Sequence, residues 1–140
     1  MSEHKILVVD DEPVLRSLIQ EALVLEGFFV ETADRAGTAL ERLQENHYDL
    51  VIADLALPDM NGILLCQKIQ ENHPQLRGKV IFITGIGLDE NTSHHLQTLA
   101  GAYLAKPFEM DSLTGTVQSL LTAAAPPGEA PVPESAETRG

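Results

Sequence analysis

Five short runs rich in apolar residues recur along the chain, each with the composition of a buried strand. The run Leu50-Val51-Ile52-Ala53 is typical, because it is brief, continuously apolar and partly β-branched. Such runs are found in strands that are covered on both faces of a sheet. The pattern predicts strands over residues 5–10, 28–32, 50–54, 79–84 and 102–105.

Helical periodicity fills the segments between these runs. Between Pro13 and Gly27, apolar residues recur at three- and four-residue spacing, which predicts an amphipathic helix with proline in its first turn and glycine after its end. The same spacing predicts helices over residues 36–45, 63–73, 90–100 and 113–121. Alternating strands and helices imply right-handed crossovers, so we expect an α/β fold with a parallel sheet covered on both faces.

The composition is that of one α/β domain. A chain of 140 residues, 44% of them hydrophobic, is long enough to form one core. The net charge of −12 argues against direct nucleic-acid binding, which normally requires a basic face. The single cysteine, Cys66, excludes an internal disulfide and is expected in the core. Without an apolar run of about 18 residues or a signal peptide, the chain is expected to be cytoplasmic, with no part in a membrane.

Residues 126–140 depart from this pattern. They contain prolines spread among glycine, alanine and glutamate, a composition that cannot bury a core. We therefore expect one domain over residues 1–125, followed by a disordered tail or linker. Two possibilities stay open, a stand-alone protein and a piece cut from a longer chain.

Polar residues stand at the ends of four of the five expected strands: Asp10 and Asp11, Asp54, Thr84 and Lys106. The carboxyl ends of parallel strands share one edge, where open α/β sheets bind ligands. Carboxylates gathered there repel one another, and a divalent cation with oxygen ligands, Mg²⁺ above all, would remove the conflict. The lysine and the hydroxyl make the set suitable for phosphoryl transfer to a carboxylate. Asp11 alone could instead cap the next helix, because Asp is a preferred N-cap residue.

Several short motifs follow the expected strands. Residues 8–12 read Val-Val-Asp-Asp-Glu, residues 57–62 read Leu-Pro-Asp-Met-Asn-Gly, and residues 83–85 and 106–108 read Ile-Thr-Gly and Lys-Pro-Phe. In order and spacing, across residues 5–123, these motifs resemble the CheY-like response-regulator receiver domain of two-component signalling. The resemblance implies a flavodoxin-like, doubly wound five-stranded sheet in the order 2-1-3-4-5, of which a member of this family is a standard example.

The resemblance also implies a phosphoacceptor and a metal site. Asp54 would accept a phosphoryl group from the phosphohistidine of a sensor histidine kinase or a phosphotransfer protein. Asp10 and Asp11 would hold Mg²⁺ together with Asp54 and the backbone carbonyl of Ala56.

A switch is implied as well. Thr84 and Lys106 would bind the phosphoryl oxygens, Tyr103 would be the aromatic switch residue, and the Lys106–Pro107 peptide bond would be cis. The signal would reach a downstream protein target through the face of the fourth helix, fifth strand and fifth helix. The domain would be a monomer or a weak, phosphorylation-dependent dimer.

Two other interpretations start from the same acidic set. An aspartyl-phosphate hydrolase wants a second acid two residues after its nucleophile, where this chain has Ala56. A binding module with a vestigial site would not need the complete set of acids, threonine and lysine. We therefore expect a signalling switch that catalyses only its own phosphorylation and dephosphorylation. Apolar Ala56 and Ile86 stand where the family tunes phosphate loss, so we expect a long-lived phosphoryl group.

Overall fold

Strands and helices alternate along the chain as the sequence predicts. The computed structural model describes residues 4–85, 94 and 101–122. The strands are β1 (Lys5–Val9), β2 (Phe29–Ala33), β3 (Leu50–Asp54), β4 (Val80–Thr84) and β5 (Ala102–Ala105). The helices are α1 (Pro13–Leu25), α2 (Ala36–Glu45), α3 (Gly62–Asn72) and α5 (Met110–Thr122), with a short 3-10 helix, η1 (Pro74–Leu76). The helix expected over 90–100 lies outside the described residues, apart from a helical His94.

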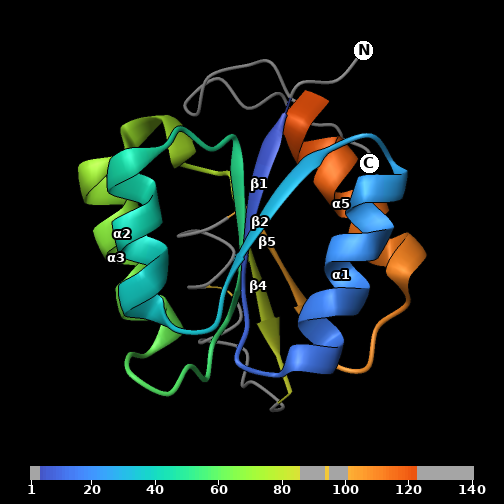
Figure 1. The fold of residues 1–140 in the computed structure, drawn as a ribbon, viewed down its shortest axis with the longest axis horizontal. Coiled ribbons are helices and arrows are strands. Elements are labelled where there is room, and N and C mark those ends of the chain that lie inside the picture. The colour runs from blue at the N-terminus through green and yellow to red at the C-terminus, as the bar shows by residue number, and fades with distance from the viewer. Residues whose placement is uncertain (1–3, 86–93, 95–100, 123–140) are drawn as a thin grey trace.

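The five strands form one parallel sheet in the order β2-β1-β3-β4-β5. Helices α2 and α3 cover one face of this sheet, and α1 and α5 cover the other (Figure 1). The prediction of a flavodoxin-like, doubly wound fold is therefore confirmed. In this order the chain reverses its direction of winding between β1 and β3, and such a point opens a crevice at the carboxyl ends of the two strands.

Two apolar layers follow from the alternation of side chains along the strands. On β3, Val51 and Ala53 belong to the layer under α2 and α3, whereas Leu50 and Ile52 belong to the layer under α1 and α5. All residues of β3 are buried, including its last one, Asp54. The central strand of the sheet thus carries a carboxylate to the edge of the core.

Four strand boundaries differ by one residue from the prediction: β1 ends at Val9 rather than at residue 10, β2 spans Phe29–Ala33 rather than 28–32, and β4 begins at Val80 rather than at residue 79. The second strand begins at Phe29 rather than Phe28, because the Phe28 N–H donates to the Leu23 carbonyl at 3.2 Å and completes the turn after α1. Gly27 makes that turn possible with a φ of 97°. The first strand ends one residue before Asp10, whose side chain accepts a hydrogen bond from the backbone beyond it.

Candidate functional site

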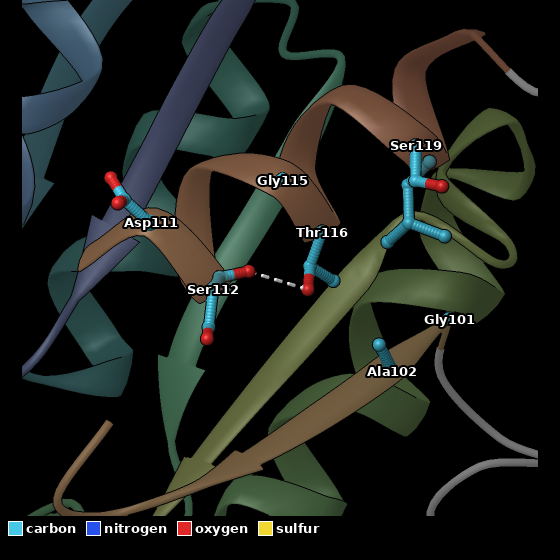
Figure 2. A pocket seen from close by; sticks show the side chains of 8 residues that line it. Gly101, Ala102, Asp111, Ser112, Gly115, Thr116 and Ser119 are labelled. Atoms are coloured by element: carbon cyan, nitrogen blue, oxygen red, sulfur yellow. Dashed lines mark hydrogen bonds between the residues drawn. The ribbon is translucent and has the colours of Figure 1, made fainter. Parts of the chain in front are cut away.

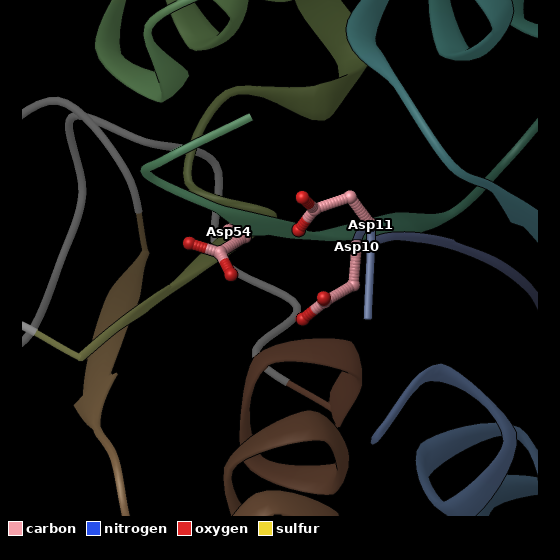
Figure 3. Close-up of side chains that lie close together, drawn as sticks. All are labelled: Asp10, Asp11 and Asp54. Carbon is pink, nitrogen blue, oxygen red and sulfur yellow. The ribbon is translucent and has the colours of Figure 1, made fainter. Parts of the chain in front are cut away.

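Three aspartates meet at the carboxyl edge of the sheet (Figure 3). Asp10 and Asp11 follow β1, and Asp54 ends the neighbouring strand β3. One carboxylate oxygen from each residue lies within 4.8 Å of those of the other two. Asp10 and Asp54 are buried, whereas Asp11 is exposed. The structure therefore brings together the acidic cluster that the sequence predicts, with one member facing solvent.

Local backbone turns orient the two buried carboxylates. Asp10 Oδ1 accepts the Glu12 N–H at 2.8 Å, and Asp54 Oδ1 accepts the Ala56 N–H at 2.9 Å. In each case an aspartate binds the backbone two residues ahead, which is how Asp starts a turn. One oxygen of each carboxylate is thus used by the chain itself, and the second is left for other partners.

Asp11 does not cap the helix that follows it. The N-cap residue of α1 is Glu12, which makes no side-chain capping bond, and Pro13 occupies the first turn. The alternative in which Asp11 has a purely structural capping role is therefore wrong. Its exposed carboxylate belongs to the acidic cluster instead.

Lys106 supplies the positive charge of the site. Its ammonium lies 3.0 Å from Asp54 Oδ2, 2.9 Å from Glu12 Oε1 and 4.0 Å from Asp10 Oδ2. Burial alone would lower the pKa of Lys106, but its hydrogen bonds to Glu12 and Asp54 and the nearby charges raise the pKa above its usual value. The side chain follows β5, and the Lys106–Pro107 peptide bond is cis. The contact with Glu12 was not predicted, although Glu12 completes the acidic run after β1.

The second oxygen of Asp10 is the least satisfied atom of the site. Asp10 Oδ2 is buried and has no hydrogen-bond partner among the described residues. Burial raises the pKa of Asp10. The hydrogen bond from the Glu12 N–H lowers this pKa and the negative charge of Asp54 raises it, so that the pKa lies above its usual value. A buried carboxylate oxygen without a partner is unfavourable. The acidic cluster therefore fits a divalent cation, which takes oxygen ligands and offsets their repulsion.

Thr84 and Tyr103 lie on neighbouring strands beside this cluster. In the sheet register, Asp54 pairs with Ile83, and Thr84 pairs with Ala105. Thr84 is only 2% exposed, and Tyr103 packs against the core layer under α2 and α3. By strand alternation, Thr84 shares that layer's side of the sheet with Tyr103. The two side chains therefore lie on the same side of the sheet, on adjacent strands.

The loop after β3 closes tightly behind Asp54. The Gly62 N–H donates to the Leu55 carbonyl at 2.8 Å, and a Cβ on Gly62 would lie 2.7 Å from Leu55 Cα. Only glycine permits this approach. Asn61 then caps α3 by accepting the Ile63 N–H at 2.7 Å. The loop is thus held at both ends.

Asp59 ties the same loop to a distant helix. Its two carboxylate oxygens accept the N–H groups of Ala36 and Gly37, each at 2.9 Å. Arg35, the N-cap residue of α2, makes no side-chain capping bond, so Asp59 caps α2 from another element. The bonds from Gly37 and Ala36 lower the pKa of Asp59. Sequence reasoning placed Asp59 only in a turn, because no local pattern points to partners in another helix.

The single cysteine is a core residue, as predicted. Cys66 is 1% exposed, and burial raises the pKa of its thiol to about 12.

Among the helices of the described residues, none has both the length and the apolar composition needed to cross a membrane.

Comparison with known sequences points to one family. Residues 6–118 match the family model described as the response regulator receiver domain. The chain is 31% identical over 119 residues to the chemotaxis protein CheY of Bacillus subtilis (strain 168), covering 84% of this chain and 98% of that protein. It is 38% identical over 122 residues to the phosphate regulon transcriptional regulatory protein PhoB of Rhizobium meliloti (strain 1021), covering 87% of this chain and 54% of that protein. The chain thus spans about half the length of this curated relative and 25% of the regulatory protein AtoC of Escherichia coli (strain K12).

Solved structures give the same result. The chemotaxis response regulator CheY4 of Vibrio cholerae superposes with a TM-score of 0.77 at 27% identity, covering 86% of this chain and all of that one, 100%. The response regulator TrrA of Thermotoga maritima, solved in complex with Mg²⁺ and BeF, superposes with a TM-score of 0.73 at 33% identity, covering 84% of this chain and 99% of that one. The chain therefore belongs to the response regulator receiver domains of two-component signalling.

Proposed function

We propose that Asp54 accepts a phosphoryl group from the phosphohistidine of a sensor histidine kinase or phosphotransfer protein, and that this modification switches binding of a downstream protein. One observation carries the proposal. Asp54 is a buried carboxylate that hydrogen-bonds Lys106 at 3.0 Å while two further carboxylates lie within 4.8 Å. This arrangement suits a nucleophile that must work beside a metal ion and the negative oxygens of a phosphoryl group.

The chemistry follows from the partners of Asp54. An oxygen of Asp54 attacks phosphorus, the bond between phosphorus and the imidazole nitrogen of the donor breaks, and its electron pair stays on that nitrogen. The Lys106 ammonium, held beside Asp54 Oδ2, would then bind one phosphoryl oxygen. The Thr84 hydroxyl, at the end of the adjacent strand, would donate to another. The same groups would assist hydrolysis of the acyl phosphate by water.

Mg²⁺ would bind through the carboxylates of Asp10, Asp11 and Asp54 and the backbone carbonyl of Ala56. These are oxygen donors, as Mg²⁺ requires, and the Oδ2 of Asp10, which accepts no hydrogen bond from the described residues, supports the assignment. When bound, the ion would neutralise charge on the phosphoryl oxygens and the cluster. A related receiver domain, TrrA, has been solved with Mg²⁺ and BeF.

The partner surface would include a groove between β5 and α5. This groove has a volume of about 510 Å³, and its α5 lining consists largely of small residues beside Gly101 and Ala102 (Figure 2). Strand β5 also carries Tyr103, which shares a face of the sheet with Thr84. Thr84 and Tyr103 lie on the α2–α3 side of the sheet, opposite α5, but β5 is an edge strand. Movement of Thr84 towards the phosphoryl group would let Tyr103 move at this edge, and the target would bind across the edge of β5 onto α5.

Phosphorylation of purified variants tests the acceptor. Incubation with a small phosphodonor and Mg²⁺ should add the mass of one phosphoryl group to the wild-type chain and none to Asp54→Asn. Asp111→Asn is the matched control, because it removes an exposed carboxylate in the first turn of α5. It should be labelled as fully as wild type. Undiminished labelling of Asp54→Asn would refute the assignment.

A further inference from the structure

A separate polar pocket of about 260 Å³ lies where the end of β2 meets α1 and α2. The chain has nine lysines and arginines against 21 acidic residues, yet two arginines from different helices line this one pocket. Two threonine hydroxyls accompany them, which gives the pocket many donors in a small volume. The lining residues are Arg16, Thr32, Ala33, Asp34, Thr38 and Arg42.

Arg42 contributes a buried N–H group that has no hydrogen-bond acceptor among the described residues. Its Nε has no hydrogen-bond partner within the part of the chain that the structure describes. The nearby positive charge of Arg42 contributes to lowering the pKa of Glu31. The Glu31 carboxylate nevertheless accepts a hydrogen bond from the Tyr48 hydroxyl and pairs with the Lys5 ammonium, not with Arg42 Nε. Thr38 lies four residues before Arg42 on α2, so both side chains lie on one side of the helix. A buried N–H without an acceptor is unfavourable unless something else binds it.

Arg16 is already held in place at the same pocket. Its Nη1 donates to the backbone carbonyl of Asp10 at 2.7 Å, and the Asp10 N–H donates to the carbonyl of Ala33 at 3.1 Å. Guanidinium has five N–H donors, so Arg16 keeps others for a ligand while its side chain is fixed. A fixed side chain loses less entropy on binding. The pocket thereby adjoins the backbone of Asp10 while none of the three clustered carboxylates lines it.

Asp34 is the one acid among the lining residues. Its carboxylate lies 3.3 Å from the Arg35 guanidinium, and both side chains are more than half exposed at 51% and 58%. Two arginines and one aspartate leave the lining with a formal charge of +1 (2 − 1). The pocket is therefore cationic within a strongly acidic chain.

We propose that this pocket binds a tetrahedral oxyanion, either inorganic phosphate or the phosphate group of a small phosphate ester. The planar forks of two arginines match the oxygens of phosphate, and threonine hydroxyls donate to the remaining oxygens. The guanidinium of Arg42, whose Nε has no acceptor among the described residues, belongs to the lining of this pocket. The pocket shares no side chain with the acidic cluster.

Titration with inorganic phosphate tests the site in the metal-free full chain at constant ionic strength. Amide and methyl signals of Thr32 and Thr38 should shift and saturate. Arg42→Gln should weaken binding about tenfold or more, since hydrogen bonds to charged groups are the strong ones. Arg77→Gln is the matched control, because Arg77 is exposed and lines no part of this pocket. It should change affinity by less than about twofold, since salt screens distant charges.

Glycerol phosphate serves as the second probe and separates the two ligand sources. Tighter binding of the ester than of phosphate assigns the pocket to phosphorylated metabolites, and the reverse assigns it to the free ion. Thr38→Val keeps the side-chain shape and should weaken binding severalfold, which decides the matter if Arg42→Gln fails to fold. Shifts that do not saturate, that centre on Thr84 instead, or that Arg42→Gln and Arg77→Gln weaken equally would overturn the proposal.

Discussion

At the scale of single residues, the acidic cluster holds more negative than positive charge when no metal ion is bound. Asp10 and Asp54 are buried, Asp11 lies beside them, and one lysine, Lys106, is shared among Asp54, Glu12 and Asp10. Like charges at such separations raise the free energy of the folded state. The protein therefore carries a local destabilisation that ligand binding would relieve.

Removing one carboxylate from the acidic cluster should reveal this destabilisation of the folded state. Metal-free Asp11→Ala should be more stable than metal-free wild type by roughly 0.5–1 kcal/mol, because an exposed carboxylate interacts only weakly with its neighbours. Mg²⁺ should raise the melting temperature of wild type but not of the variant. Asp34→Ala, which removes an exposed acid paired with Arg35, should respond to Mg²⁺ as wild type does. A lower melting temperature of metal-free Asp11→Ala would contradict the crowded cluster.

Asp59 should make stability depend on pH. Its pKa is lowered in the folded state by the N–H groups of Gly37 and Ala36, so its contribution is present above the unfolded value of about 3.9 and is lost as pH falls through the folded pKa. Asp59→Asn should lower the melting temperature by a few degrees at pH 7, and the difference should shrink in acid. Unfolding at a series of pH values measures this. A difference that is the same at every pH would show that the charge of Asp59 does not matter.

At the scale of elements, the site depends on strand register. Val9 pairs with Ala53, Asp54 pairs with Ile83, and Thr84 pairs with Ala105. Asp10 therefore stands level with Asp54, Thr84 stands one residue further along, and Lys106 stands two residues further, so polar side chains leave four strands at the same edge of the sheet. A slip of one residue would turn a strand's side chains to the opposite face, so the apolar layers on both faces hold the site in register.

The link between β4 and β5 should transmit the state of Asp54. Beryllofluoride with Mg²⁺ should shift amide signals at Asp54, at Thr84 and along residues 102–105. Thr84→Ala should confine the shifts to the immediate site, because it removes the hydroxyl that shares a face of the sheet with Tyr103. Thr84→Ser keeps the hydroxyl and should restore the longer range. If wild-type shifts stay beside Asp54, this domain does not signal through β5.

At the scale of the whole molecule, the described part of the core extends to the last helix. The last helix, α5, ends at Thr122, and its buried residues are Leu113 and Val117. Residues 126–140 have a composition that cannot bury apolar surface. The stability of the domain should therefore come from the chain before them.

Truncation tests this division. Removing residues 126–140 should leave the melting temperature and the phosphorylation of Asp54 unchanged. Removing the chain from residue 113 onward deletes buried Leu113 and Val117 and should unfold the domain, since each large core side chain contributes a few kcal/mol. Thermal unfolding monitored by circular dichroism measures both. A marked loss of stability in the shorter truncation would show that the tail packs on the domain.

Most of the fold could be predicted because buried strands and amphipathic helices leave local patterns. The apolar run before Asp54 and the run ending at Thr84 identified central strands, and the polar residues after them identified the edge of the sheet where the carboxylates gather. The start of β2 was misplaced by one residue, because the Phe28 N–H binds Leu23 rather than a strand. A hydrogen bond made across a turn does not alter the apolar pattern.

Contacts between segments far apart in the sequence could not be predicted from these local patterns. Glu12 meets Lys106 across 94 residues of sequence, and Asp59 meets Ala36 across 23. Neither pair has a periodicity or a motif that relates its members. They meet because parallel strands bring the loops after them to one edge, and the exact course of those loops sets which side chains touch.

The amino-acid sequence alone specified the alternation of elements, the acids at the strand ends and the family resemblance, because each depends on residues close together in the chain. Packing in three dimensions brought Glu12 to Lys106, left Asp10 Oδ2 without a hydrogen-bond partner among the described residues, and placed Arg16 and Arg42 at one pocket. These features depend on how helices cross the two faces of the sheet and how closely loops approach. Local hydrophobic patterns determine what is buried, whereas the distance between two charged groups on separate elements is determined only when the whole core is packed.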